Sequence, residues 1–241
     1  MYRDYYPSAD WEKIMALSNT KETPFLIVLL DRIQRKYEEF CTCFPSAKIY
    51  YAVKANPGVE LLALLRDLGS NFDIASIYEL DRVLDLGVTA DRMSFGNTIK
   101  KARHIREAYE KGVRLFTSDC EMDIRNIAKE APGSRVFFRL LMDAVTSDSD
   151  WPLSRKFGCQ PRMSMDLIVL AADLGLEPYG VSFHVGSQQR EIPAWDAAIG
   201  QAHALFDWME QKHLRLKAIN MGGGFPADYL VKANPLSVYA E

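Results

Sequence analysis

The stretch Tyr50-Tyr51-Ala52-Val53-Lys54-Ala55-Asn56-Pro57 decides how the rest of the chain is interpreted. Its aromatic and β-branched residues predict a strand over Ile49–Lys54. Lys54 then stands at the C-terminal end of an apolar strand, which is where α/β barrels carry their reactive side chains. Lys54 is therefore a candidate site residue, and the alternative is an ordinary solvated lysine at a strand end.

Outward from this stretch, β-rich segments alternate with segments of helical periodicity. This alternation predicts βαβ units and a parallel sheet. The predicted strands are Ile49–Lys54, Asn71–Ala75, Arg92–Phe95, Leu115–Thr117, Val136–Leu141, Gly180–His184 and Ala218–Met221. The predicted helices lie near 58–68, 77–87, 99–111, 120–130, 163–175 and 194–213. Such units fit an open doubly wound sheet or a closed eight-stranded barrel, which seven strands leave one strand short.

Both ends of the chain depart from this alternation. Pro24–Asp31 is predicted to be a strand that runs into an amphipathic helix near 32–43. We expect residues 1–31 to form a lead-in segment and residues 32–241 to form the barrel domain, incomplete at its C-terminus. No closing strand or helix is expected in Ala233–Glu241.

A long connection, residues 142–162, follows the fifth predicted strand and contains Trp151, Arg155 and Phe157. Because the loops after barrel strands form the catalytic face, this connection is a candidate substrate or cofactor loop. A solvated connector is the alternative.

Composition excludes several classes of protein. Of the 241 residues, 48% are apolar and 25% charged, which is typical of a soluble globular enzyme or binding domain, and we expect a cytoplasmic one. The net charge of −3 argues against affinity for nucleic-acid phosphates. The longest apolar run, Phe25–Leu30, is too short for a membrane span. No cysteine stands in a C-x-x-C pair, so no metal site is expected.

Two further patterns accompany Lys54. A lysine amine whose pKa is depressed by burial or nearby positive charge attacks an aldehyde to form an imine. Gly222-Gly223-Gly224, directly after the last predicted strand, let backbone N–H groups close on a phosphate, a role that late barrel loops often have. The alternative for the glycines is a tight turn without a ligand.

Polar side chains follow the other predicted strands. His184 ends the sixth strand, where its imidazole can stack on a flat cofactor ring, and the hydroxyl of Ser187 can join the glycines on a phosphate. Asp73, Glu79 and Arg139 each stand at or just past a strand end, where a charge can orient a ligand. The alternatives are a core histidine, two helix-terminus caps and a buried ion-pair partner.

Six motifs together resemble the ornithine/lysine decarboxylase family, whose barrel is of the alanine racemase type. In chain order they are Tyr51-Ala52-Val53-Lys54-Ala55-Asn56, Phe72-Asp73-Ile74-Ala75-Ser76, Gly96-Asn97-Thr98-Ile99-Lys100, Trp151-Pro152-Leu153-Ser154-Arg155-Lys156-Phe157-Gly158-Cys159, Phe183-His184-Val185-Gly186-Ser187-Gln188 and Gly222-Gly223-Gly224-Phe225-Pro226. The resemblance runs from about Thr23 to Tyr229.

The resemblance implies a role for each candidate. Lys54 is expected to form the Schiff base with pyridoxal phosphate and His184 to stack on the pyridine ring. Ser187 and Gly222, Gly223 and Gly224 are expected to hold the phosphate. Asp73, Glu79 and Arg139 match positions that line or support the cofactor site. The implied function is decarboxylation of ornithine or lysine to the diamine in polyamine biosynthesis, by a homodimer.

The same resemblance also implies features of the family that this sequence does not contain. In the family an eighth strand brings an acidic residue to the ring nitrogen, and a C-terminal β-domain brings a cysteine and aspartates across the dimer interface. We therefore expect this chain alone to be inactive. Diaminopimelate decarboxylase, a non-catalytic pyridoxal-phosphate-binding or regulatory homologue, and an aldolase that uses a lysine imine are the alternatives.

Overall fold

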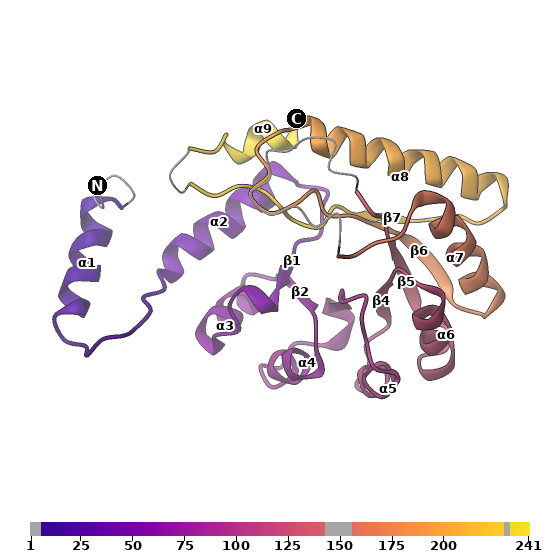
Figure 1. Ribbon diagram of the computed structural model, residues 1–241. Coiled ribbons are helices and arrows are strands. Elements are labelled where there is room, and N and C mark those ends of the chain that lie inside the picture. Colours follow the sequence, from indigo (N-terminus) through magenta and orange to yellow (C-terminus); the bar gives the residue numbers. More distant parts are fainter. Residues whose placement is uncertain (1–5, 143–155, 229–231) are drawn as a thin grey trace.

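A computed structural model describes residues 6–142, 156–228 and 232–241 (Figure 1). Its centre is one seven-stranded parallel sheet in which the strands follow one another in chain order. A doubly wound sheet reverses its strand order part-way, so this curled sheet is of the barrel class. The strands are Tyr50–Ala52 (β1), Asn71–Ile74 (β2), Met93–Phe95 (β3), Leu115–Ser118 (β4), Arg135–Arg139 (β5), Glu177–Ser182 (β6) and Ala218–Asn220 (β7).

Most of the helices lie around the curled sheet, and the first helix lies apart from it (Figure 1). Their bounds, with two short 3₁₀ helices, are Ser8–Ser18 (α1), Leu30–Cys43 (α2), Val53–Ala55 (η2), Val59–Asp67 (α3), Ile77–Leu84 (α4), Ala90–Arg92 (η3), Ala102–Glu110 (α5), Glu121–Glu130 (α6), Pro161–Asp173 (α7), Pro193–Gln211 (α8) and Leu236–Ala240 (α9). None of the helices in these described ranges is long and apolar enough to cross a membrane.

The two faces of the sheet differ because successive side chains of a strand point to opposite faces. Toward the helices the sheet presents aromatic side chains that are at most 1% exposed, namely Phe72, Phe95, Phe116 and Phe138. Toward the inside of the curl it presents polar residues, for example Asp73 and its register partner Ser94. The apolar core therefore lies between sheet and helices, and the inner face is left for polar chemistry.

The prediction of a strand over Pro24–Asp31 is wrong. No strand pairs with this segment among the described residues, and α2 already begins at Leu30. The side chain of Leu26 is 82% exposed. An apolar run becomes a strand only where a neighbouring strand accepts its backbone hydrogen bonds and buries one face.

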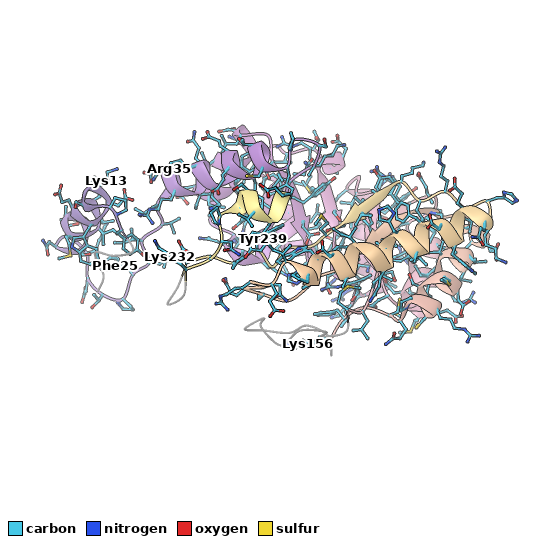
Figure 2. The ribbon with its side chains drawn as sticks, turned by 90° about the horizontal axis from the view of Figure 1, so that it is seen from above. Lys13, Phe25, Arg35, Lys156, Lys232 and Tyr239 are labelled. Carbon is cyan, nitrogen blue, oxygen red and sulfur yellow. The ribbon has the colours of Figure 1, made fainter. Side chains whose placement is uncertain are left out.

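The C-terminal prediction is also wrong, because α9 forms within the segment expected to lack structure. Its Leu236 is 7% exposed, and the helix packs against α2. Figure 2 shows α9 between α2 and the start of α8. The contacts that order this short helix come from residues far away in the sequence.

The long connection after β5 is described only in part. Residues 143–155, including Trp151 and Arg155, lie outside the described residues, so the substrate-loop prediction stays a prediction. Beyond them, Cys159 pairs with Leu140 and donates its N–H to the carbonyl of Arg139 at 2.9 Å. The connection thus returns to the carboxyl end of β5.

Candidate cofactor site

Lys54 lies in η2, directly after β1, and not in the strand itself. The preceding Val53 is completely buried, whereas Lys54 is exposed. Its positive charge nevertheless lowers the pKa of both Asp73 and His184. The structure therefore places a reachable amine within electrostatic range of two other candidates.

Asp73 belongs to β2, and the pKa of its carboxyl group is strongly raised. Burial raises its pKa to about 7, the charge of Glu79 adds to this rise, and the charges of Lys54 and Arg139 oppose it. Loss of hydration disfavours the carboxylate, and nearby cations restore part of that loss. Asp73 is thus poised between its two protonation states near neutral pH.

Glu79 caps a helix, as the alternative interpretation of the sequence predicted. Its carboxylate accepts the N–H of Ala75 at 2.8 Å, and its own N–H donates to the Ser76 hydroxyl at 3.3 Å. This reciprocal arrangement caps the start of α4. Glu79 therefore combines a helix cap with a negative charge next to Asp73.

Gly96, directly after β3, is a residue that the sequence analysis did not single out. A Cβ at this position would lie 2.7 Å from the Asp73 carboxyl carbon, too close for any side chain. The Gly96 N–H also donates to the Ile74 carbonyl at 3.0 Å. Its place in the Gly96-Asn97-Thr98-Ile99-Lys100 motif was the available signal, but only the structure connects it with Asp73.

Arg139 ends β5 on the same edge of the sheet. Burial lowers its pKa, while the charges of Asp119 and Asp73 oppose that shift. Its guanidinium lies 5.0 Å from the centre of the Phe157 ring. Asp119 accepts the N–H of Gly158 at 2.8 Å and so ties the returning connection to the end of β4.

His184 lies two residues beyond β6. Its Nδ1 accepts the N–H of Gly186 at 3.0 Å, so a neutral ring carries its proton on Nε2. Burial, with the charges of Arg139 and Lys54, lowers its pKa to about 4. His184 is therefore an uncharged flat ring at neutral pH, which suits stacking on an electron-poor heterocycle.

The glycine turn packs directly on the His184 segment. Gly222 and Gly224 have φ values of +69° and +98°. A Cβ on Gly222 would collide with the carbonyl oxygen of Phe183, and one on Gly224 with the carbonyl oxygen of Gly186. Gly223 faces the imidazole, since its Cβ would stand 3.7 Å from Nε2 of His184.

Ser187 completes the set of predicted residues. It lies in the turn after Gly186 with an exposed side chain, so its hydroxyl is accessible to a ligand. The candidates thus gather on the carboxyl edge of the sheet: an exposed amine, a neutral imidazole, a poised carboxyl and a glycine turn. An aldehyde-bearing aromatic ring with a phosphate tail matches these groups in chemistry.

Comparison with known proteins agrees with this match. A family model described as the pyridoxal binding domain of pyridoxal-dependent decarboxylases covers residues 30–241. The chain belongs to this decarboxylase family. The family assignment predicted from the six motifs is confirmed, and so is pyridoxal 5′-phosphate as the cofactor of this type of domain.

Individual relatives give the degree of similarity. The chain is 37% identical over 215 residues to the lysine/ornithine decarboxylase of Selenomonas ruminantium, covering 89% of this chain and 54% of the relative. It is 32% identical over 216 residues to antizyme inhibitor 2 of Xenopus laevis, covering 89% of this chain and 47% of the relative. A crystal structure titled SrLDC in complex with PLP and cadaverine superposes with a TM-score of 0.87 at 35% identity, over 95% of this chain and 58% of that chain.

The chain spans about half the length of the curated relatives it matches. The decarboxylase family is therefore identified through its pyridoxal binding domain, whose model matches residues 30–241.

Proposed function

We propose that the protein to which this chain belongs decarboxylates ornithine, lysine or both to the corresponding diamine, with pyridoxal phosphate as cofactor, in polyamine biosynthesis. The observation that supports this proposal most directly is the position of Lys54. Its exposed amine follows β1 on the edge of the sheet that also carries His184 and the glycine turn. When bound, the cofactor supplies an electron-withdrawing ring that accepts the electrons released as carbon dioxide leaves.

The proposed role of each residue follows from its chemistry. In this proposal the exposed amine of Lys54 would hold the aldehyde end of the cofactor. His184 would offer the cofactor ring a flat, uncharged surface, because its pKa of about 4 keeps it neutral. The charges around the amine come from Asp73, Glu79 and Arg139. The phosphate would be bound by Ser187 together with Gly222, Gly223 and Gly224.

The substrate proposal depends on the relatives. The Selenomonas ruminantium relative is named for lysine and ornithine, and the SrLDC structure holds cadaverine. A small basic amino acid is therefore the proposed substrate, with diaminopimelate as the alternative. We further propose a cytoplasmic homodimer, in keeping with the resemblance, as the form of the whole protein.

A regulatory homologue without turnover is the second candidate function. Its support is the 32% identity to a protein named antizyme inhibitor 2. Release of carbon dioxide from ornithine, lysine or diaminopimelate by the whole protein, measured for each in turn, separates these possibilities. Release from ornithine or lysine supports the decarboxylase, and cofactor binding with no release supports the regulatory homologue.

Borohydride trapping of the cofactor on this chain tests the proposed site. After incubation with pyridoxal phosphate, reduction and mass analysis, we expect a pyridoxyl group on Lys54. Lys54→Ala should abolish the adduct and leave the far-ultraviolet circular dichroism unchanged. Lys48→Ala, an exposed lysine at the opposite end of β1, is the matched control and should keep the adduct.

Two results contradict the proposal. An adduct on another lysine, or one that forms only with a sugar phosphate, would favour the lysine-imine aldolase. Loss of the dichroism in Lys54→Ala would assign Lys54 a structural task.

A further inference from the structure

We propose that Phe225 is a positioning residue: a cluster of aromatic rings around it fixes the glycine turn and so sets the affinity for the phosphate end of the cofactor. This inference rests on the proposed function, in which Gly222–Gly224 bind that phosphate. It adds to the phosphate site one residue and the three helices that pack against it.

Phe225 directly follows the glycine turn and is the centre of the cluster. Its ring stacks on Trp195 at 5.3 Å between centroids with an interplanar angle of 23°. It meets Phe40 at 5.4 Å and Phe44 at 5.6 Å. Tyr239 approaches edge-on at 6.0 Å and contacts Trp195 at 5.3 Å.

The partners of Phe225 come from three separate helices. Phe40 and Phe44 lie at the end of α2, Trp195 lies in the first turn of α8, and Tyr239 lies in α9. The Tyr239 hydroxyl donates to the carbonyl of Arg190 at 3.3 Å, which ties α9 to the segment before α8. Figure 2 shows Tyr239 on α9, between α2 and α8.

Backbone contacts hold the other side of the turn. The Gly222 N–H donates to the Asn220 side-chain oxygen at 2.9 Å, and the Gly224 carbonyl accepts the N–H of Gln189 at 2.9 Å. Gly222 and Gly224, with φ values of +69° and +98°, have no side chain that could pack against a neighbouring element. The first side chain after Gly224 that packs on other elements is Phe225.

The physical consequence follows from preorganisation. A turn held in its binding conformation loses little backbone entropy when an anion binds, whereas a mobile turn loses more. Aromatic pairs at these separations stabilise the packed arrangement beyond the burial of their area. Loss of the ring should therefore weaken phosphate binding and leave the aldehyde end at Lys54 unaffected.

The test compares two ligands that differ only in the phosphate. Dissociation constants of pyridoxal phosphate and pyridoxal are measured spectroscopically for the wild type and for Phe225→Leu. We expect about tenfold weaker binding of pyridoxal phosphate and an unchanged constant for pyridoxal. Tyr239→Leu removes a second ring of the cluster from a peripheral helix, and we expect the same selective loss, smaller in size.

Phe137→Leu is the matched control, because Phe137 pairs with Tyr179 at 5.3 Å and has no contact with Phe225 among the ring pairs of the described residues. It should leave both constants unchanged. Equal weakening of both ligands in Phe225→Leu, or no weakening in the two cluster variants, overturns the inference. If Phe225→Leu does not fold, the result for Tyr239→Leu decides. A wild type that forms no adduct on Lys54 would instead refute the proposed function itself.

Discussion

At the scale of single residues, the positive charge of Lys54 changes the pKa of two other residues of the site. The same cation stabilises a carboxylate and repels an imidazolium, so it lowers the pKa of Asp73 and of His184. Lys54→Ala should therefore raise both pKa values, moving Asp73 above about 7 and His184 above about 4. Nuclear magnetic resonance titration of the cofactor-free protein measures both, with Lys48→Ala as control. A rise in one and a fall in the other would contradict the arrangement.

Gly96 allows a second residue-scale prediction. Gly96→Ala should push the Asp73 carboxyl away from its place, because the new Cβ would meet it at less than contact distance. We expect about a tenfold lower affinity for pyridoxal phosphate, equivalent to ~1.4 kcal/mol. The measurement is a spectroscopic titration, together with thermal unfolding.

Gly200→Ala is the control for this variant. Gly200 lies inside α8, and a Cβ there meets no heavy atom within 4 Å. The substitution should stabilise the helix by about 0.5–1 kcal/mol and leave cofactor affinity unchanged. Equal affinities of the Gly96→Ala and Gly200→Ala variants would show that Asp73 tolerates a neighbouring methyl group.

At the scale of elements, Lys100 joins the loop after β3 to β4 and α6. Its ammonium, which is 0% exposed, donates to the carbonyls of Asn97 and Thr117 and forms a 2.8 Å ion pair with Asp123. Burial lowers the pKa of Lys100 and raises that of Asp123, and their mutual attraction opposes both shifts. Each buried charge is therefore stabilised by the other.

Removal of one partner should be more destabilising than removal of both. Lys100→Met leaves the Asp123 carboxyl buried without its cation, and we expect a loss of about 3–5 kcal/mol in the free energy of unfolding. The double variant Lys100→Met/Asp123→Leu should recover part of that loss. Urea unfolding of the single and double variants measures it. Additive losses would mean that the two side chains act independently.

At the scale of the whole molecule, the open edges of the sheet govern association. Within the described residues, β1 and β7 each pair with a strand on one side only. Unpaired strand edges bind other strands. We therefore expect a polypeptide of these 241 residues to associate or aggregate as its concentration rises, measured by light scattering coupled to size-exclusion chromatography. A monodisperse monomer that melts cooperatively would contradict this expectation.

The sequence by itself determined the order and kind of the elements around the site. Alternating β-rich and helical segments predicted the seven parallel strands, which the structure confirms, since hydrophobic period and turn residues act over short distances. The motifs likewise predicted the family and its cofactor, both confirmed. The roles of Lys54, Ser187 and the other candidates stay predictions.

Only the tertiary structure decided which residues act on one another. It left Pro24–Asp31 without a partner strand among the described residues, ordered α9 against α2, and placed an exposed Lys54 within electrostatic range of a half-buried Asp73. It also brought Phe40, Trp195 and Tyr239 around Phe225. Strand pairing, burial and shifted pKa values depend on groups far apart in the chain, and no local pattern of residues contains that information.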